Sequence, residues 1–322
     1  MNRRAWTLLV TLGAIWGASY LFIKIGVRDL SPGMVAWSRI ALAAIVLVGL
    51  AAARGALGGF GGKLGALVVL GAVQVAGPFL LIAAGEQEIS SSLAGILVTS
   101  APLFTALLAI WVDQEERSQG TRLIGVLLGV AGVGVLLGVD LGGSGDQLLG
   151  GLAVVLAGLG YAIGGFIVKR RLATVAPIGV AAWVMVVSTV LIAPAAAIGF
   201  PESAPGLGPV AAVVALGVVG TGIAFAIFYE LIATVGPARA FIVTYLAPAF
   251  AVVYGATLLD EEISVATITG LTLVLAGSWL AAEGRLRLRR GRRDLSGDPA
   301  SQQGGGAVGI VPEAVGEAVE DR

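Results

Sequence analysis

The chain is divided into apolar blocks about 20 residues long, and no other feature limits its fold as strongly. A helix of that length crosses the hydrocarbon core of a bilayer, because each residue adds about 1.5 Å. Ten such blocks can be marked, at residues 6–25, 33–53, 64–84, 89–111, 121–139, 147–168, 177–199, 208–232, 240–259 and 264–282. The pattern predicts an all-α polytopic membrane protein with ten transmembrane helices.

The composition agrees with this class. Hydrophobic residues make up 57% of the chain and charged residues 12%, with a mean hydropathy of +0.96. A soluble domain has about 25% charged residues, so this chain has too few charges to cover a soluble surface. It contains no Cys and no His. Disulfides, thiol catalysis and the commonest zinc ligands are therefore excluded, and we expect neither a metal nor a cofactor.

The positive charges are distributed unevenly between the two sides of the predicted membrane. With the N-terminus in the cytoplasm, seventeen of the 20 Lys and Arg residues lie on the inner side, ten before residue 284 and seven after it. Lys24 and Arg28 lie outside, and Arg39 lies within the second block. By the positive-inside rule, both termini are predicted to be cytoplasmic, in the cell inner (plasma) membrane. Residues 284–322 are polar and Gly-rich, which predicts a disordered cytoplasmic tail.

The sequence also contains a weak internal repeat. A shift of 145 residues places "WGASYLFIK" (16–24) on "YAIGGFIVK" (161–169), and "SPGM" (31–34) on "APIG" (176–179). Each half holds five predicted spans. Because five is odd, the second half must enter the membrane from the opposite side. We therefore predict two inverted five-helix repeats, at residues 1–141 and 142–283.

Each half carries a proline inside an apolar block. Pro102 lies in "GILVTSAPLFTALLAIWVDQEER" (95–117) and Pro248 in "AFIVTYLAPAFAVVYGATLLDEEI" (240–263). Proline frees a backbone carbonyl, which in a membrane must be satisfied by neighbouring helices or a water-filled cavity. Interrupted helices at matching positions of inverted halves indicate a transport site. The alternative is a bent helix without ligand contact. We expect the acids that end both segments to lie in water.

Several polar and aromatic residues at similar depth are candidates for substrate binding. They are Trp16, Tyr20, Gln74, Thr99, Tyr161 and Tyr245. Polar groups within a membrane usually face the bundle interior or a cavity. Two alternatives remain open. The aromatic residues can act as interfacial anchors, and Gln74 can form a hydrogen bond between helices.

Arg39 and Glu230 are charged residues that lie within predicted spans. Arg39 can bind a substrate carboxylate, or it can pair with backbone carbonyls and hold helices together. Glu230 lies about one turn inside its span and is a candidate for a proton-linked role. All other acids are expected in loops, at helix ends or in the tail. The sequence therefore predicts facilitated diffusion or exchange rather than proton coupling through a mid-membrane carboxylate.

Three segments resemble the EamA family of the drug/metabolite transporter superfamily. They are "AIWGASYLFIK", "SPGMVAWSRIALAA" and "FYELIATVGPARAFIVTYLAPAFAVVYGATLLDEE", and the resemblance covers about residues 6–282. One departure is "LLDEE", where the family more often has a Gly-Glu pair. The resemblance implies a ten-helix secondary transporter in two inverted halves, with no enzymatic step. The family's substrates are amino acids, other metabolites or drugs, and they are often exported.

The sequence thus predicts an exporter or exchanger of small metabolites such as amino acids, working by alternating access. A non-transporting membrane scaffold or a lipid-handling protein is the alternative. The lack of His, Cys and clustered carboxylates within the spans weakens a third possibility, a membrane enzyme. The expected partners are a small-molecule substrate and the lipid bilayer, without nucleic acid. We expect a monomer.

Overall fold

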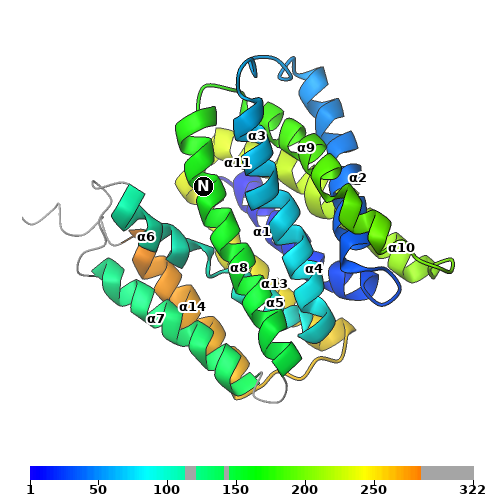
Figure 1. Ribbon diagram of the computed structural model, residues 1–322. Coiled ribbons are helices and arrows are strands. Elements are labelled where there is room, and N and C mark those ends of the chain that lie inside the picture. The colour runs from blue at the N-terminus through cyan, green and yellow to red at the C-terminus, as the bar shows by residue number, and fades with distance from the viewer. Residues whose placement is uncertain (113–120, 141–144, 284–322) are drawn as a thin grey trace, which may run out of the picture. The chain divides into compact units, whose positions relative to one another are not determined.

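The computed structural model describes residues 1–112, 121–140 and 145–283, which form helices without any strand (Figure 1). The predicted tail and the acids at 113–116 lie outside the described residues. The first half contains α1 (Arg3–Gly26), α2 (Pro32–Ala53), α3 (Leu64–Leu70), η1 (Gly71–Ala76), α4 (Gly77–Glu88), α5 (Ser91–Val98), α6 (Ala101–Val112), α7 (Thr121–Val135) and η3 (Leu136–Asp140). The second half contains α8 (Gly145–Ile167), η4 (Val168–Leu172), α9 (Pro177–Ile198), α10 (Leu207–Gly217), η5 (Val218–Ile223), α11 (Ala224–Val235), α12 (Pro237–Ala240), α13 (Val243–Leu258) and α14 (Val265–Glu283).

Local sequence signals explain where several helices begin. The side chain of Asn2 accepts a hydrogen bond from the Ala5 amide at 2.9 Å and caps α1. Ser31 caps α2 in the same way, with Pro32 as the first helical residue, and Ser90 caps α5. These side chains satisfy amides that have no partner within the first helical turn.

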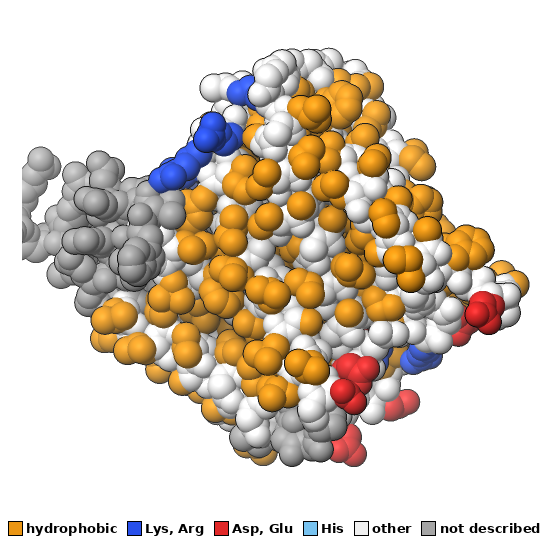
Figure 2. Space-filling view, viewed as in Figure 1, with side chains coloured by type: hydrophobic (Ala, Val, Ile, Leu, Met, Phe, Trp, Pro, Cys, Tyr) orange, Lys and Arg blue, Asp and Glu red, His pale blue; other side chains and the backbone are white. Residues whose placement is uncertain are grey.

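Among the described residues, seven helices are long and apolar enough to cross a membrane, and three shorter ones are also apolar. Their positions match the predicted blocks to within a few residues. The class is therefore confirmed as an all-helical polytopic membrane protein, whereas ten crossings and the inverted repeat remain predictions. Figure 2 shows hydrophobic side chains covering the middle of one face. Lys and Arg side chains lie near the top of the view and again at the lower right, where most of the acidic side chains also lie.

Two of the predicted spans are single blocks in the sequence but contain a π-helical segment near the middle. These segments are η1 between α3 and α4, and η5 between α10 and α11. Side-chain hydroxyls bind carbonyls in or just before them: Ser188 Oγ donates to Gly71 O at 3.1 Å, and Thr221 Oγ1 donates to Leu216 O at 3.0 Å. π-Helical segments are rare and often occur at functional sites.

The two prolines occupy different local structures. Around Thr99 and Ser100 the chain leaves the helix, so α5 and α6 are separate, and Pro102 is the second residue of α6. Ser278 Oγ donates to the Thr99 carbonyl at 3.1 Å, which is one way to satisfy a backbone group in an apolar environment. Pro248 instead lies inside the continuous helix α13, and the helix break in this part of the chain comes earlier, between α12 and α13.

The main helix contacts join the first half of the chain to the second. Helix α7 packs along α14, as Figure 1 shows, and α2 packs along α9. Helix α1 contacts α13 and α10, while α8 contacts α6 and α4. Helices α5 and α13, each of which adjoins one of the two helix breaks, also contact each other.

Small residues allow several of these contacts, because they let membrane helices approach closely. A Cβ at Gly17 of α1 would lie 2.8 Å from the Ala247 carbonyl of α13, and one at Gly125 of α7 would lie 2.7 Å from the Gly277 carbonyl of α14. The backbones at these points therefore approach too closely for any larger residue.

Candidate substrate-binding site

Arg39 lies at the centre of the site and joins the two halves of the chain. Its side chain is buried, with 9% exposed. Its Nε donates to Thr221 Oγ1 of η5 at 2.8 Å, and its guanidinium carbon lies 3.8 Å from the ring centroid of Phe79 in α4. Both contacts suit the planar guanidinium group, which donates from a fixed edge and stacks on aromatic faces. Arg39 thus connects α2 to α4 and η5.

Part of the Arg39 guanidinium is not used by these contacts. Within the part of the chain that the structure describes, its two Nη atoms form no hydrogen bond. Carboxylates are the usual partners of such a pair of donors, because two parallel N–H groups match their two oxygens. Arg39 therefore contacts two neighbouring elements through its Nε and its planar face, and its Nη atoms have no hydrogen bond among the described residues.

Tyr20 and Tyr161 lie beside Arg39. Both tyrosines are close enough to the guanidinium to interact with it electrostatically, from α1 and α8 respectively. The Tyr20 ring also packs on α5, where a Cβ at Gly95 would lie 3.2 Å from Tyr20 Cδ2. The structure thus brings three of the predicted site residues, Tyr20, Arg39 and Tyr161, to one place in the bundle.

Two other predicted site residues belong to different surroundings. Trp16 packs against Phe225 and Phe228 of α11, with ring centroids 6.3 and 5.3 Å apart, and Phe228 in turn contacts Phe241. Gln74 of η1 is half-buried and covers Gly164 of α8. Trp16 is therefore part of an aromatic cluster, and Gln74 lies at the contact between η1 and α8.

Thr99 and Tyr245 lie near the breaks in the two helices. Thr99 is buried, and its hydroxyl donates to the Ile96 carbonyl at 2.6 Å. Tyr245 is half-buried in the first turn of α13. The Thr99 hydroxyl therefore satisfies a carbonyl in the last turn of α5.

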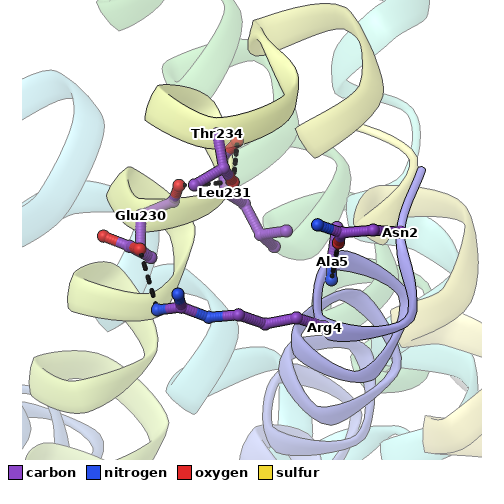
Figure 3. A network of polar contacts seen from close by, with 6 residues as sticks. All are labelled: Asn2, Arg4, Ala5, Glu230, Leu231 and Thr234. Carbon is purple, nitrogen blue, oxygen red and sulfur yellow. Dashed lines mark hydrogen bonds and ion pairs between the residues drawn. The ribbon is translucent and has the colours of Figure 1, made fainter.

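Glu230 lies at the edge of the bundle rather than in its core. Its carboxylate accepts a bond from Arg4 of α1 at 3.2 Å, and the two side chains are 39% and 75% exposed (Figure 3). Figure 3 also shows Thr234 bound to the Glu230 carbonyl, at 2.8 Å. Exposed ion pairs of this kind contribute about 0–1 kcal/mol to stability.

Glu86 is a buried acid that the apolar pattern does not predict. The block at 64–84 places Glu86 at a helix end, but the helix continues to Glu88 and Glu86 is fully buried, with 0% exposed. Both of its carboxylate oxygens are without a hydrogen-bond partner among the described residues. The sequence signal was present, since only four residues separate Glu86 from the next helix, too few for a loop that leaves the bundle.

Lys24, which is predicted to lie on the outer side of the membrane, is half-buried and has backbone partners. Its Nζ donates to the carbonyls of Glu86 and Ile89, at 2.6 and 2.8 Å. These carbonyls lie at the C-terminal end of α4, where a cation is favoured by the helix dipole. Lys24 therefore fastens the end of α1 to the end of α4.

The expectation that the acids after residue 259 lie in water is wrong for Glu261. Its carboxylate accepts bonds from the amides of Ser91 and Ser92, at 2.7 and 3.0 Å, and from Ser92 Oγ at 2.5 Å. It therefore caps α5 from the α13–α14 connector. Among the described residues, no cluster of three or more acidic side chains could hold a metal ion.

An all-helical bundle with charged side chains buried between apolar helices is the architecture of a polytopic membrane transport protein. Placing a charged side chain within a membrane costs free energy, so buried charges there usually mark a transport pathway. Residues 4–138 and 148–282 each match the model of the EamA-like transporter family. The chain therefore belongs to the EamA-like transporter family and is a membrane transporter rather than an enzyme.

Known relatives and one solved structure agree with this assignment. The chain is 28% identical to the uncharacterized inner membrane transporter YedA of Escherichia coli, over 80% of this chain and 83% of that protein. It is 25% identical to a probable terminal-alkyne amino-acid exporter of Streptantibioticus cattleyicolor, over 90% and 97%. A crystal structure with 22% identity superposes with a TM-score of 0.62, over 89% of this chain and all of that one, and shows the same fold.

Proposed function

We propose that the protein is a secondary transporter that exports or exchanges small metabolites such as amino acids, by alternating access between two inverted five-helix halves. The observation that carries the proposal is the group formed by buried Arg39 and half-buried Tyr20 and Tyr161, where helices of both halves meet. A binding site between two halves can be opened to either side when one half moves against the other.

The helix contacts support the inverted repeat. Under a five-span shift, the contacts of α1 with α13 and α10 correspond to those of α8 with α6 and α4. The contacts α2–α9, α7–α14 and α5–α13 each join a span to its own counterpart in the other half. The π-helical segments η1 and η5 fall in corresponding spans, and one family match falls on each half.

Two observations support an amino acid as substrate. The free Nη atoms of Arg39 suit a carboxylate, and Tyr20 and Tyr161 add aromatic rings and hydroxyl groups near the guanidinium. The Streptantibioticus cattleyicolor relative is named as an exporter of an amino acid. The inner-membrane location is supported by the name of YedA, and the cytoplasmic termini by the distribution of Lys and Arg.

The test is exchange in proteoliposomes that contain the purified protein and a panel of unlabelled amino acids and other metabolites. We expect labelled substrate to enter only vesicles loaded with a transported compound. Arg39→Lys, which keeps the charge but not the paired donors, should weaken exchange of carboxylate-bearing substrates most. A wild type that exchanges no member of the panel would favour the scaffold or lipid-handling alternative.

A further inference from the structure

Glu86 is the least satisfied ionisable side chain in the described bundle. It has no exposed surface, and neither carboxylate oxygen has a hydrogen-bond partner among the described residues. It shares one face of α4 with Phe79, Ile82 and Ala83, all of them buried. An ionised carboxylate in a dry interior costs several kcal/mol unless it is paired, whereas the neutral acid costs far less.

The cations around Glu86 are engaged elsewhere. On α1, the Lys24 ammonium binds backbone carbonyls, including that of Glu86 itself, rather than the carboxylate. On α2, the Arg39 guanidinium interacts with Glu86 electrostatically, but it donates to Thr221 and stacks on Phe79. Neither cation therefore forms a hydrogen-bonded pair with Glu86 in this conformation.

The other groups near Glu86 do not supply a partner either. Tyr20 of α1 interacts with it electrostatically, and α8 contributes Tyr161, which faces Arg39. Close to the start of α5, the carboxylate of Glu261 adds a second negative charge, which is held by Ser91 and Ser92. Two acids thus lie near each other in opposite surroundings: Glu261 is hydrogen-bonded as an anion, and Glu86 is not.

Building on the proposed transport function, we propose that Glu86 binds a proton in this conformation and releases it during transport, so that protons are exchanged for substrate. A small cleft of about 250 Å³, lined by Lys24, Val27, Arg28, Glu86 and Gln87, lies beside it at the predicted outer end of the bundle. When α1 moves away from α4, the contacts of Lys24 break and water enters. The proton then passes from the Glu86 carboxyl to water, and the freed Lys24 ammonium stabilises the carboxylate.

The first test needs no substrate. Infrared spectra of the purified protein at neutral pH should show the carbonyl stretch of a protonated carboxylic acid. This band should disappear in Glu86→Gln, move in Glu86→Asp, and persist in Glu88→Gln, the matched control at an exposed acid of the same helix. If the wild type lacks the band, or if Glu86→Gln and Glu86→Asp both leave it unchanged, Glu86 does not hold the proton.

The second test measures coupling in proteoliposomes with an amino-acid panel. With one proton exchanged per substrate, a gradient of one pH unit should concentrate substrate about tenfold in the wild type and in Glu88→Gln. Glu86→Gln should lose this accumulation and retain exchange at equal pH. Exchange in the wild type without any response to the pH gradient would refute the coupling. If the wild type exchanges nothing, the proposed function is refuted, while the infrared result still decides the proton site.

Discussion

Replacing Glu261 is the most direct test of the contact between α5 and the α13–α14 connector. Its carboxylate joins the α13–α14 connector to the first turn of α5 through three hydrogen bonds, to two amides and one hydroxyl. The contact links the two predicted halves. Glu261→Ala removes all three bonds and leaves the helix packing of both elements intact.

The expected magnitude follows from the contact. A hydrogen bond to a charged group contributes about 1.5–3 kcal/mol, and an anion at a helix N-terminus adds about 0.3–1 kcal/mol. Because Glu261 is half-buried, water can form some of the hydrogen bonds that the Ser91 and Ser92 groups lose. We therefore expect a net loss of about 2 kcal/mol, which corresponds to roughly a 30-fold shift toward conformations in which α5 and the connector separate.

Thiol labelling in detergent can measure this shift. The chain contains no native Cys, and the Ser91 side chain is only 1% exposed, so Ser91→Cys reports when the contact opens. Adding Glu261→Ala should raise the labelling rate about 10- to 30-fold, in line with the shift derived above. Gly255→Ala should act similarly, because its Cβ would overlap the Glu261 carboxylate. Glu262→Ala, at an exposed neighbour, is the control.

An unchanged labelling rate in a folded Glu261→Ala variant would refute the reasoning. Such a result would show that water replaces the contact without loss of stability, or that the conformation does not depend on the contact. A rise of equal size in Glu262→Ala would attribute the effect to total charge in the connector rather than to the bonds with Ser91 and Ser92.

Two further predictions concern folding. Arg39→Ala should lower the free energy of unfolding by about 2 kcal/mol, because the stacking on Phe79 and the bond to Thr221 are both lost. A normal melting temperature together with normal transport would contradict both roles considered for Arg39. Gly17→Ala should destabilise by about 1–3 kcal/mol, since its Cβ would overlap α13. Gly49→Ala, which meets nothing within 4 Å, should show no loss, and equal melting temperatures for the two variants would exclude tight packing at Gly17.

The sequence by itself determined the class and the positions of the helices. Apolar blocks of membrane-spanning length leave the backbone no other way to satisfy its hydrogen bonds in lipid. Capping residues such as Asn2, Ser31 and Ser90 determine where helices begin. The family resemblance could be recognised for the same reason, because its motifs lie on these helices.

The tertiary structure alone decided which polar groups are internal. Glu86 and Glu261 both follow an apolar block and look alike in the sequence, yet one is buried without a partner and the other caps α5. Likewise Pro102 adjoins a break in the helix, whereas Pro248 lies within α13. The physical reason is that burial at a helix end depends on what a neighbouring helix presents there. That neighbour is tens to hundreds of residues away in the chain, as Lys24 is from Glu86 and Glu261 is from Ser91.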